Sequence, residues 1–185
     1  TDMTANLSPF VQRKLALAFY RFDLTKDGLV KADDLQQYGE MVAKQLNLAK
    51  GTDQYNKVVG KFENIWSAYF KGADRDGDGQ VTLADYIAAT TAFLGSANAA
   101  EQSKNINATL FDALDVDGSG QIDAHELAIF LSPMGVAERD AYMAFGYMDR
   151  DRSGHISREE FAQNLYDYFA SNDRNAAGNW FYGSL

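Results

Sequence analysis

The sequence predicts an all-α protein in which four helix–loop–helix units pair into two lobes that pack into a compact globule. Three observations support this fold class. An acidic pattern of twelve residues occurs four times, at residues 23–34, 74–85, 115–126 and 149–160. A phenylalanine stands four residues before each copy, and an apolar residue directly follows each copy. Residues at these places belong to the inward faces of two flanking helices, so four copies predict eight helices.

The first half of the chain contains signals for the limits of the first and third helices. Ser8 and Pro9 form an N-cap and first-turn pair for a helix that runs to about Phe22. Thr52 lies in the helix-breaking segment "NLAKGTD" and can cap a long helix that ends near Ala73.

The second half contains the expected boundary between the lobes. Gly95 is suited to end a helix, and residues 98–101 have the spacing of a capping box for the next one. The segment "SPMG" at 132–135 separates the third unit from the fourth. We therefore expect an N-terminal pair over residues 1–95 and a C-terminal pair over residues 96–185, with the end of the chain packed against it.

The twelve-residue pattern has the spacing of the EF-hand calcium loop. Oxygen-bearing side chains occupy the first, third, fifth and twelfth places, and glycine occupies the sixth. In such loops, places one, three, five, seven, nine and twelve supply oxygens to a hard cation, and the glycine permits a sharp turn. The eighth place is aliphatic, and we expect short β-bridges there between paired loops, at Val30, Val81, Ile122 and Ile156.

The same spacing assigns candidate metal ligands. In the second loop they are Asp74, Asp76, Asp78, Gln80 (carbonyl) and Asp85. In the third they are Asp115, Asp117, Ser119, Gln121 (carbonyl), Asp123 (through water) and Glu126. In the fourth they are Asp149, Asp151, Ser153, His155 (carbonyl), Ser157 and Glu160.

A weaker site is expected in the first loop. Its candidate ligands are Asp23, Thr25, Asp27, Leu29 (carbonyl) and Asp34. Thr25 brings a neutral oxygen and Lys31 brings a positive charge to the ninth place, so the occupancy of this loop stays open.

The last ligand of each loop bears on the choice of metal. The first two loops end in Asp and the last two end in Glu, which can bind Ca²⁺ with both oxygens. Asp is one methylene shorter, and a single oxygen at this place suits Mg²⁺ better than it suits Ca²⁺. We expect calcium in the loops, tightest in the third and fourth, with magnesium competing mainly in the first two.

The charge of the chain lies in the loops. The net charge is −9, and the four loops hold 16 of the 26 acidic residues but only 6 of the 17 basic ones. No basic stripe remains to neutralise phosphates, so nucleic acid is not an expected partner.

Other functional classes find little support in the sequence. No apolar run approaches the ~20 residues of a membrane helix, the start lacks the pattern of a secretory signal, and cysteine is absent. No Ser/His/Asp or Glu/His constellation indicates catalysis. The expectation is a cytoplasmic protein that is not an enzyme and does not insert into membranes.

With these loops, the chain resembles the sarcoplasmic calcium-binding protein family, whose relatives include calerythrin and the coelenterazine-binding proteins. The loops start 51, 41 and 34 residues apart, so the first pair has the longer connection, and the chain ends in "NWFYGSL". The resemblance implies lobes packed against each other and a role as a cytosolic calcium buffer. In this family the second loop is often the degenerate one, whereas here the first loop is the poorer.

The aromatic residues leave two interpretations open. They either fill a core between the lobes, which we favour, or line a cavity for an apolar, luciferin-like molecule whose release calcium controls. The residues concerned are Trp66, Tyr69, Phe70, Phe93, Phe111, Phe130, Tyr142, Phe145, Trp180, Phe181 and Tyr182. Three consecutive aromatics at an exposed end would promote association, so the tail from Asn179 to Leu185 is expected to fold back onto apolar surface.

A third alternative is a calcium sensor that docks on a partner helix. Such sensors open to present a methionine-rich groove. Only five methionines occur in this chain, so a protein target is possible but not indicated.

Overall fold

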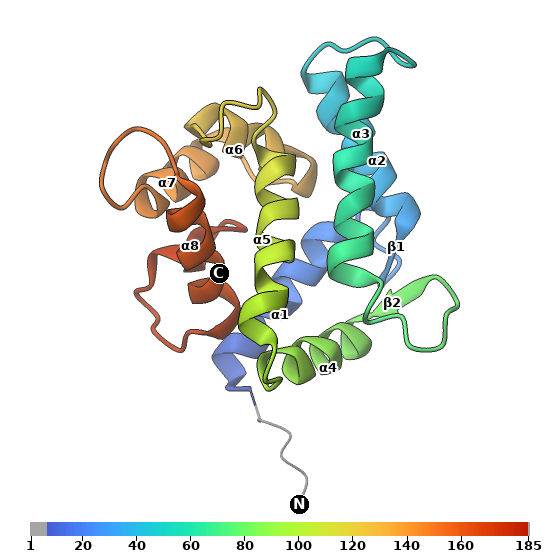
Figure 1. The fold of residues 1–185 in the computed structure, drawn as a ribbon, viewed down its shortest axis with the longest axis vertical. Coiled ribbons are helices and arrows are strands. Elements are labelled where there is room, and N and C mark those ends of the chain that lie inside the picture. Colours follow the sequence, from blue (N-terminus) through green and yellow to red (C-terminus); the bar gives the residue numbers. More distant parts are fainter. Residues whose placement is uncertain (1–6, 185) are drawn as a thin grey trace, which may run out of the picture.

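A computed structural model describes residues 7–184. Within this range it contains eight α-helices, and the predicted all-α fold is confirmed (Figure 1). The α-helices are α1 (Pro9–Phe22), α2 (Ala32–Gln45), α3 (Asp53–Ile65), α4 (Leu83–Leu94), α5 (Ala99–Leu114), α6 (Ala124–Leu131), α7 (Glu138–Met148) and α8 (Arg158–Ala170). The shorter elements are β1 (Leu29–Lys31), β2 (Gln80–Thr82), the π-helical turn η1 (Trp66–Phe70) and the 3₁₀ turns η2 (Ser132–Met134) and η3 (Ala177–Trp180).

Two of the three predicted N-caps form. The Ser8 side chain accepts a hydrogen bond from the N–H of Val11, and the Thr52 side chain accepts one from the N–H of Tyr55. Asn98 directly precedes α5, but its side chain makes no capping bond. The capping box predicted at 98–101 is therefore wrong, although the helix starts where it was expected.

The third helix changes its winding before it reaches the second loop. It is α-helical to Ile65 and then continues as η1, in which the N–H of Lys71 donates to the carbonyl of Trp66 at 2.9 Å. A π-helical turn widens the backbone and re-aims the side chains that it carries, and such turns are frequent at functional sites.

Loops pair through the residues at the eighth place, as predicted. Val30 of β1 lies opposite Val81 of β2 in an antiparallel sheet. Ile122 and Ile156 form an isolated antiparallel bridge, with N–H to carbonyl distances of 3.0 and 2.8 Å. All four side chains are fully buried, so each bridge also contributes apolar packing beneath its loops.

One apolar core runs through the whole molecule. The four phenylalanines that precede the loops and the four apolar residues that follow them are all buried, namely Phe19, Phe70, Phe111, Phe145, Leu35, Tyr86, Leu127 and Phe161. The ring of Tyr38 on α2 lies 5.4 Å from that of Phe130 on α6, and the Tyr38 hydroxyl donates to the Phe130 carbonyl. Aromatic packing therefore continues from the first pair of hands into the second.

The C-terminal tail folds back onto this core. Phe181 and Tyr182 are fully buried, with the Phe181 ring 6.2 Å from Phe130 and the Tyr182 ring 5.8 Å from Phe22. Leu185, the last residue of the tail, lies outside the described residues. The tail packs against both pairs of hands and contributes two aromatic side chains to the core.

Candidate metal centres

Loop 3 (residues 115–126) brings three acidic side chains together. One carboxylate oxygen from each of Asp115, Asp117 and Glu126 lies within 4.8 Å of the others, and Asp115 and Glu126 are buried. Glu126 reaches back across the loop, where Oε1 accepts from the N–H of Val116 at 3.0 Å and Oε2 accepts from the N–H of Asp123 at 3.0 Å. The outgoing helix α6 thus carries its carboxylate to the start of the loop.

One oxygen of this group is left without a protein partner. Asp115 Oδ2 accepts from the N–H of Gly120 at 3.0 Å, but the buried Oδ1 accepts no hydrogen bond from the residues that the structure describes. A buried carboxylate oxygen without a partner is unfavourable. Three converging carboxylates with one such oxygen fit a hard divalent cation.

Loop 4 (residues 149–160) has the same arrangement. Asp149, Asp151 and Glu160 form a second group of carboxylate oxygens within 4.8 Å of one another. Glu160 Oε1 accepts from the N–H of Arg150 at 3.1 Å, and Oε2 accepts from the N–H of Ser157 at 2.9 Å. The twelfth-place Glu therefore closes this loop too.

The neutral candidate ligands of loops 3 and 4 lie at matching places. The Ser119 hydroxyl donates to the Gln121 carbonyl at 3.0 Å, and the Ser153 hydroxyl donates to the His155 carbonyl at 3.0 Å. The fifth- and seventh-place oxygens therefore lie side by side in both loops. The ninth-place residues, Asp123 and Ser157, cap the outgoing helices through their side chains.

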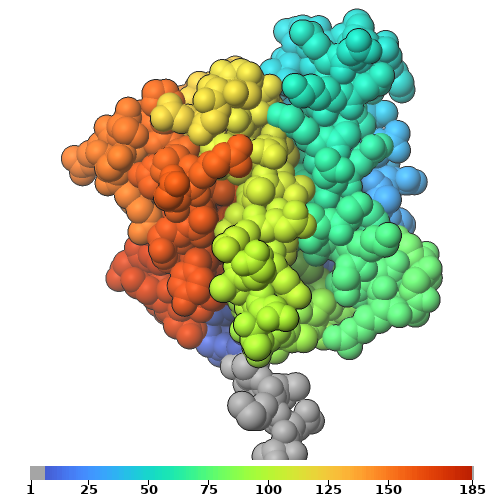
Figure 2. All heavy atoms as spheres, viewed as in Figure 1, coloured from blue at the N-terminus to red at the C-terminus, as the bar shows by residue number. Residues whose placement is uncertain are grey.

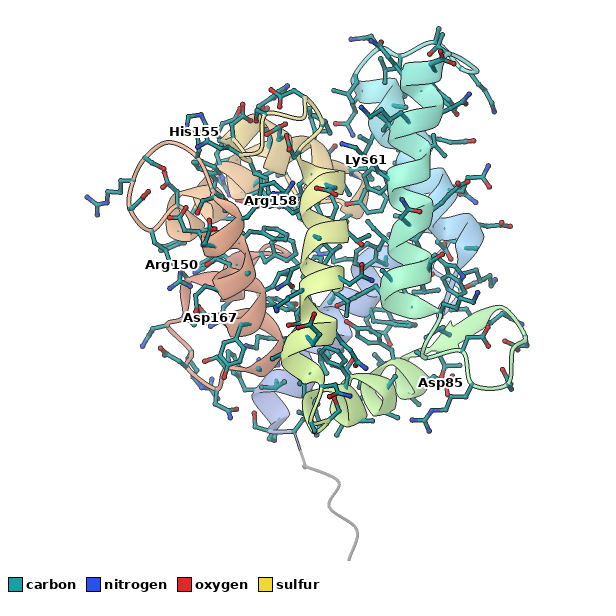
Figure 3. The ribbon with its side chains drawn as sticks, in the orientation of Figure 1. Lys61, Asp85, Arg150, His155, Arg158 and Asp167 are labelled. Atoms are coloured by element: carbon teal, nitrogen blue, oxygen red, sulfur yellow. The ribbon has the colours of Figure 1, made fainter. Side chains whose placement is uncertain are left out.

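Loop 2 (residues 74–85) gathers its first three carboxylates but not its last. Asp74, Asp76 and Asp78 form a third group within 4.8 Å, which does not include Asp85. Asp85 Oδ2 instead accepts from the N–H and the hydroxyl of Thr82, at 3.1 and 2.5 Å, and these bonds lower the pKa of Asp85. Asp85 serves as a helix cap at the edge of the loop (Figure 3).

The side chain of Gln80 adds a further contact in loop 2. Its Nε2 donates to Asp78 Oδ2 at 3.1 Å, while its backbone N–H donates to Asp78 Oδ1 at 2.8 Å. Both bonds hold the fifth-place carboxylate beside the seventh place, where the carbonyl of Gln80 is the expected ligand.

Loop 1 (residues 23–34) contains a lysine that pairs with one of its own candidate ligands. Lys31 Nζ lies 2.5 Å from Asp27 Oδ2, and the pair lowers the pKa of Asp27 and raises the pKa of Lys31. Asp34 is buried, and its Oδ1 accepts from the N–H of Thr25 at 3.3 Å. Within the described part of the chain, loop 1 forms no group of three carboxylates like those of the other loops.

A large cavity lies beside the outgoing helix of the second hand. Its volume is about 1100 Å³, and residues of η1, α4, α5 and α8 line it, among them Tyr69, Tyr86, Phe93, Ile106, Leu165 and Phe169. The sequence of α4 is strongly apolar, yet Tyr86 is its only buried residue. Several apolar side chains of this helix are half-buried because they face the cavity instead of a filled core.

Eight of the eleven aromatic residues singled out in the sequence lie in the core or line the cavity. Phe70, Phe111, Phe130, Phe145, Phe181 and Tyr182 are buried in the core, as the favoured interpretation requires, whereas Tyr69 and Phe93 line the cavity. Tyr142 is 44% exposed on α7, so its placement in either interior was wrong. Trp180 is half-buried and stacks on Tyr147, with ring centroids 4.6 Å apart.

Three basic residues that the loop pattern did not identify make bonds near the loops or between helices. Lys61 Nζ donates to the carbonyl of Asp115 at 2.7 Å. Arg150, the second residue of loop 4, lies 2.5 Å from Asp167 on α8 (Figure 3). Lys14 is fully buried and donates to the carbonyl of Asp167 at 2.7 Å.

A periodic signal in the sequence marks two of these residues. Lys14 stands three residues after Val11 and four before Ala18, on the apolar face of its helix. Lys61 has the same spacing from Val58 and Ile65. A cation on an apolar helical face indicates a specific buried or half-buried partner.

Comparison with known proteins gives matches along the whole chain. A family model described as an EF-hand domain pair matches residues 107–166, which include loops 3 and 4. The luciferin-binding protein of Renilla reniformis is 25% identical over 191 residues, which cover 100% of this chain and 99% of the relative.

Two solved structures have the same fold. The coelenterazine-binding protein from Renilla muelleri, in its calcium-loaded apo form, gives a TM-score of 0.79 at 21% identity, covering 97% of this chain and 100% of that one. A sarcoplasmic calcium-binding protein from amphioxus gives 0.69 at 21% identity, again covering 97% and 100%. In the part of this chain that the structure describes, no helix has the length and apolar character needed to cross a membrane.

Proposed function

We propose that this EF-hand calcium-binding protein is a cytoplasmic calcium buffer of the sarcoplasmic calcium-binding type, with three working sites, in loops 2, 3 and 4. The observation that carries the proposal is the set of three carboxylate groups, one in each of these loops, with oxygens within 4.8 Å of one another. Loop 2 belongs to the N-terminal pair of hands that we propose for residues 1–95, and loops 3 and 4 belong to the C-terminal pair proposed for residues 96–185.

The ligand assignment follows the order of the loops. Asp115, Asp117 and Glu126 hold the cation in loop 3, and Asp149, Asp151 and Glu160 hold it in loop 4. A Glu at the twelfth place can offer both oxygens to Ca²⁺, and in both loops this carboxylate already spans the loop. Loops 3 and 4 are therefore the tightest calcium sites.

Loop 2 is the site at which magnesium competes. Asp74, Asp76 and Asp78 supply three charges, but Asp85 is bonded to Thr82 and lies outside their group. Fewer protein oxygens leave more of the shell to water, which suits Mg²⁺ because it dehydrates reluctantly. Loop 1 is weaker still, because Lys31 already neutralises Asp27.

The packing around the loops favours a buffer over a sensor. The four phenylalanines that precede the loops are buried, and one core joins both pairs of hands. Among the residues that the structure describes, the two exposed methionines, Met41 and Met143, lie on different helices and line no common groove. A sensor would need to open its hands and expose such a groove.

Calcium titration by calorimetry, with and without millimolar magnesium, tests the buffer function. Three equivalents are expected, and Glu126→Gln and Glu160→Gln should each remove one high-affinity equivalent. Asp140→Asn, which removes an acidic side chain from α7 outside the loops, is the matched control. It should change neither the number of calcium equivalents nor their affinity. Full stoichiometry and affinity in both Glu variants would overturn the assignment, and a large calcium-dependent rise in apolar dye binding would favour a sensor.

A second candidate function rests on the cavity beside α4. Its volume of about 1100 Å³ and its aromatic and aliphatic lining suit an apolar molecule, and one relative of this chain is named for luciferin binding. Titration with coelenterazine, monitored by tryptophan fluorescence, should show saturable binding of one equivalent. Phe93→Ala should weaken this binding, and Tyr142→Ala should not. Unsaturable binding, or equal behaviour of the two variants, would exclude this function.

A further inference from the structure

We propose that Lys61, on α3 of the first pair of hands, sets the calcium affinity of loop 3 in the second pair by holding a positive charge at the first residue of that loop. The inference rests on the proposed calcium site in loop 3. It assigns a metal-tuning role to a residue outside the twelve-residue pattern.

The position of Lys61 is fixed by the packing of its helix. Val58, Phe62 and Ile65 bury the inner face of α3, and α3 runs alongside α5, whose C-terminal end leads into loop 3 (Figure 1). Figure 2 shows α5 on the surface between α3 and α8. Lys61 projects from α3 toward the end of α5 (Figure 3), and its ammonium donates to the Asp115 carbonyl at 2.7 Å.

The ammonium of Lys61 faces three carboxyl groups. Asp115 has the largest electrostatic effect on this ammonium, and Asp112 and Glu126 have smaller effects of the same sign. The like charge of Lys57 acts in the opposite direction. Burial lowers the pKa of Lys61, whereas these carboxyl groups favour its charged form. Asp112 is also paired with Arg158 at 2.8 Å. The negative charges of Asp115 and Glu126, two of the three acidic ligands, therefore depend more on Lys61 for a nearby positive charge.

This arrangement has opposite consequences with and without calcium. Without the cation, the ammonium offsets repulsion among the carboxylates of loop 3 and so stabilises the protein. With the cation, the ammonium repels it across a partly buried region, where screening is weak. Loop 4 has no matching contact in the described residues: of its own arginines, Arg150 is paired with Asp167 and Arg158 with Asp112. Loop 4, measured in a Glu126→Gln background, therefore serves as the reference, and Lys61→Met should leave its calcium affinity unchanged.

The test measures both consequences in the full chain. In a Glu160→Gln background, loop 3 is the remaining high-affinity site, so calorimetry at low ionic strength measures it apart from the weaker loop 2. Thermal unfolding in chelator follows the metal-free protein. Lys61→Met should raise the affinity of loop 3 by roughly fivefold and lower the melting temperature of the metal-free protein. Lys61→Arg should keep both parental values, and Lys57→Met, one turn earlier on the same helix, should change the affinity by less than about twofold. The Lys61→Met effect on affinity should shrink in high salt.

The outcomes separate the possible roles. If Lys61→Met lowers both affinity and stability, the residue only positions the loop and the proposal is overturned. Unchanged calcium affinity of loop 3 in both Lys61→Met and Lys61→Gln also overturns the proposal. Lys61→Gln is included in case Lys61→Met folds poorly. Loss of calcium binding at loop 3 with Lys61 intact would instead contradict the proposed function.

Discussion

Asp34 accepts a hydrogen bond from the backbone N–H of Thr25, across the full width of loop 1, at 3.3 Å. Asp85 occupies the same twelfth place in loop 2, yet it accepts its hydrogen bonds from the N–H and hydroxyl of Thr82, three residues away. The shorter side chain of Asp therefore spans the loop only where the outgoing helix lies close enough. Asp34 spans its loop in this way, whereas Asp85, at the start of the helix beside the cavity, does not join the carboxylates of Asp74, Asp76 and Asp78.

Replacing Asp85 with Glu should raise the calcium affinity of loop 2 and reduce competition by magnesium there. The added methylene lets the carboxylate reach the group formed by Asp74, Asp76 and Asp78, and a bidentate Glu favours calcium. Asp34→Glu is the matched control, because Asp34 already reaches across its loop, and it should have a smaller effect. Calcium titrations at fixed magnesium concentrations measure both. Equal responses of the two loops would show that side-chain length does not govern the second site.

Removing the internal cation of loop 1 should create a fourth, weak calcium site. Lys31→Thr gives loop 1 the same ninth residue as loop 2, where Thr82 stands. It also frees Asp27 from its ion pair with Lys31 at 2.5 Å. Calcium titration should then show one additional equivalent of low affinity. Lys26→Asn removes the same charge from an exposed place in the loop and suits the left-handed backbone there (φ 57°), so it should add no site. A fourth equivalent in the control, or none in Lys31→Thr, would contradict this account.

Much of the fold was predictable because the loop pattern fixes both chemistry and geometry. The sixth-place glycines adopt φ values of 79° to 87°, and the eighth-place residues form the bridges that their register predicts. These features depend on residues within one loop or on its symmetric partner. A repeat that occurs four times makes each of them visible in the sequence.

Features that depend on contacts between distant helices were not predictable in the same way. The loop spacing placed Asp85 with its three acidic neighbours, but the position of α4 decides whether it reaches them. The cavity likewise follows from how far α4 stands from α5 and α8, which no local pattern encodes. The bond from Lys61 to loop 3 joins residues 54 positions apart.

A methyl group at Gly178 should dislodge the tail. A Cβ built there would lie 2.0 Å from the carbonyl oxygen of Asn164 and 2.7 Å from Cβ of Asp167, so η3 would have to move away from α8. Gly178→Ala should lower the free energy of unfolding by about 2–4 kcal/mol and increase apolar dye binding. Gly146→Ala, in α7 with open space around it, is the control and should stabilise the protein by about 0.5–1 kcal/mol. Chemical denaturation measures both values, and equal stability of the two variants would refute the tight packing of the tail.

The buried Lys14 should make stability rise with pH in a defined window. Its ammonium donates to the carbonyls of Asp167 and Ser171, at 2.7 and 2.8 Å, and to Asn179 Oδ1 at 3.0 Å. Burial lowers the pKa of Lys14 to about 8, and the charge of Asp167 opposes this shift. At pH 7 the side chain is charged in both the folded and the unfolded chain, so its contribution does not vary there.

Between pH 8 and the unfolded value of 10.5, the unfolded chain binds the Lys14 proton more strongly than the folded chain does. Stability must rise with pH wherever the unfolded state holds more protons, so the parent should gain about 1–2 kcal/mol between pH 7.5 and 9.5 relative to Lys14→Met. Because other titrating groups are common to both proteins, the difference between their free energies of unfolding isolates Lys14. Urea denaturation at several pH values gives this difference. A difference that stays constant over the window would mean that the three oxygen acceptors hold Lys14 in its charged form throughout.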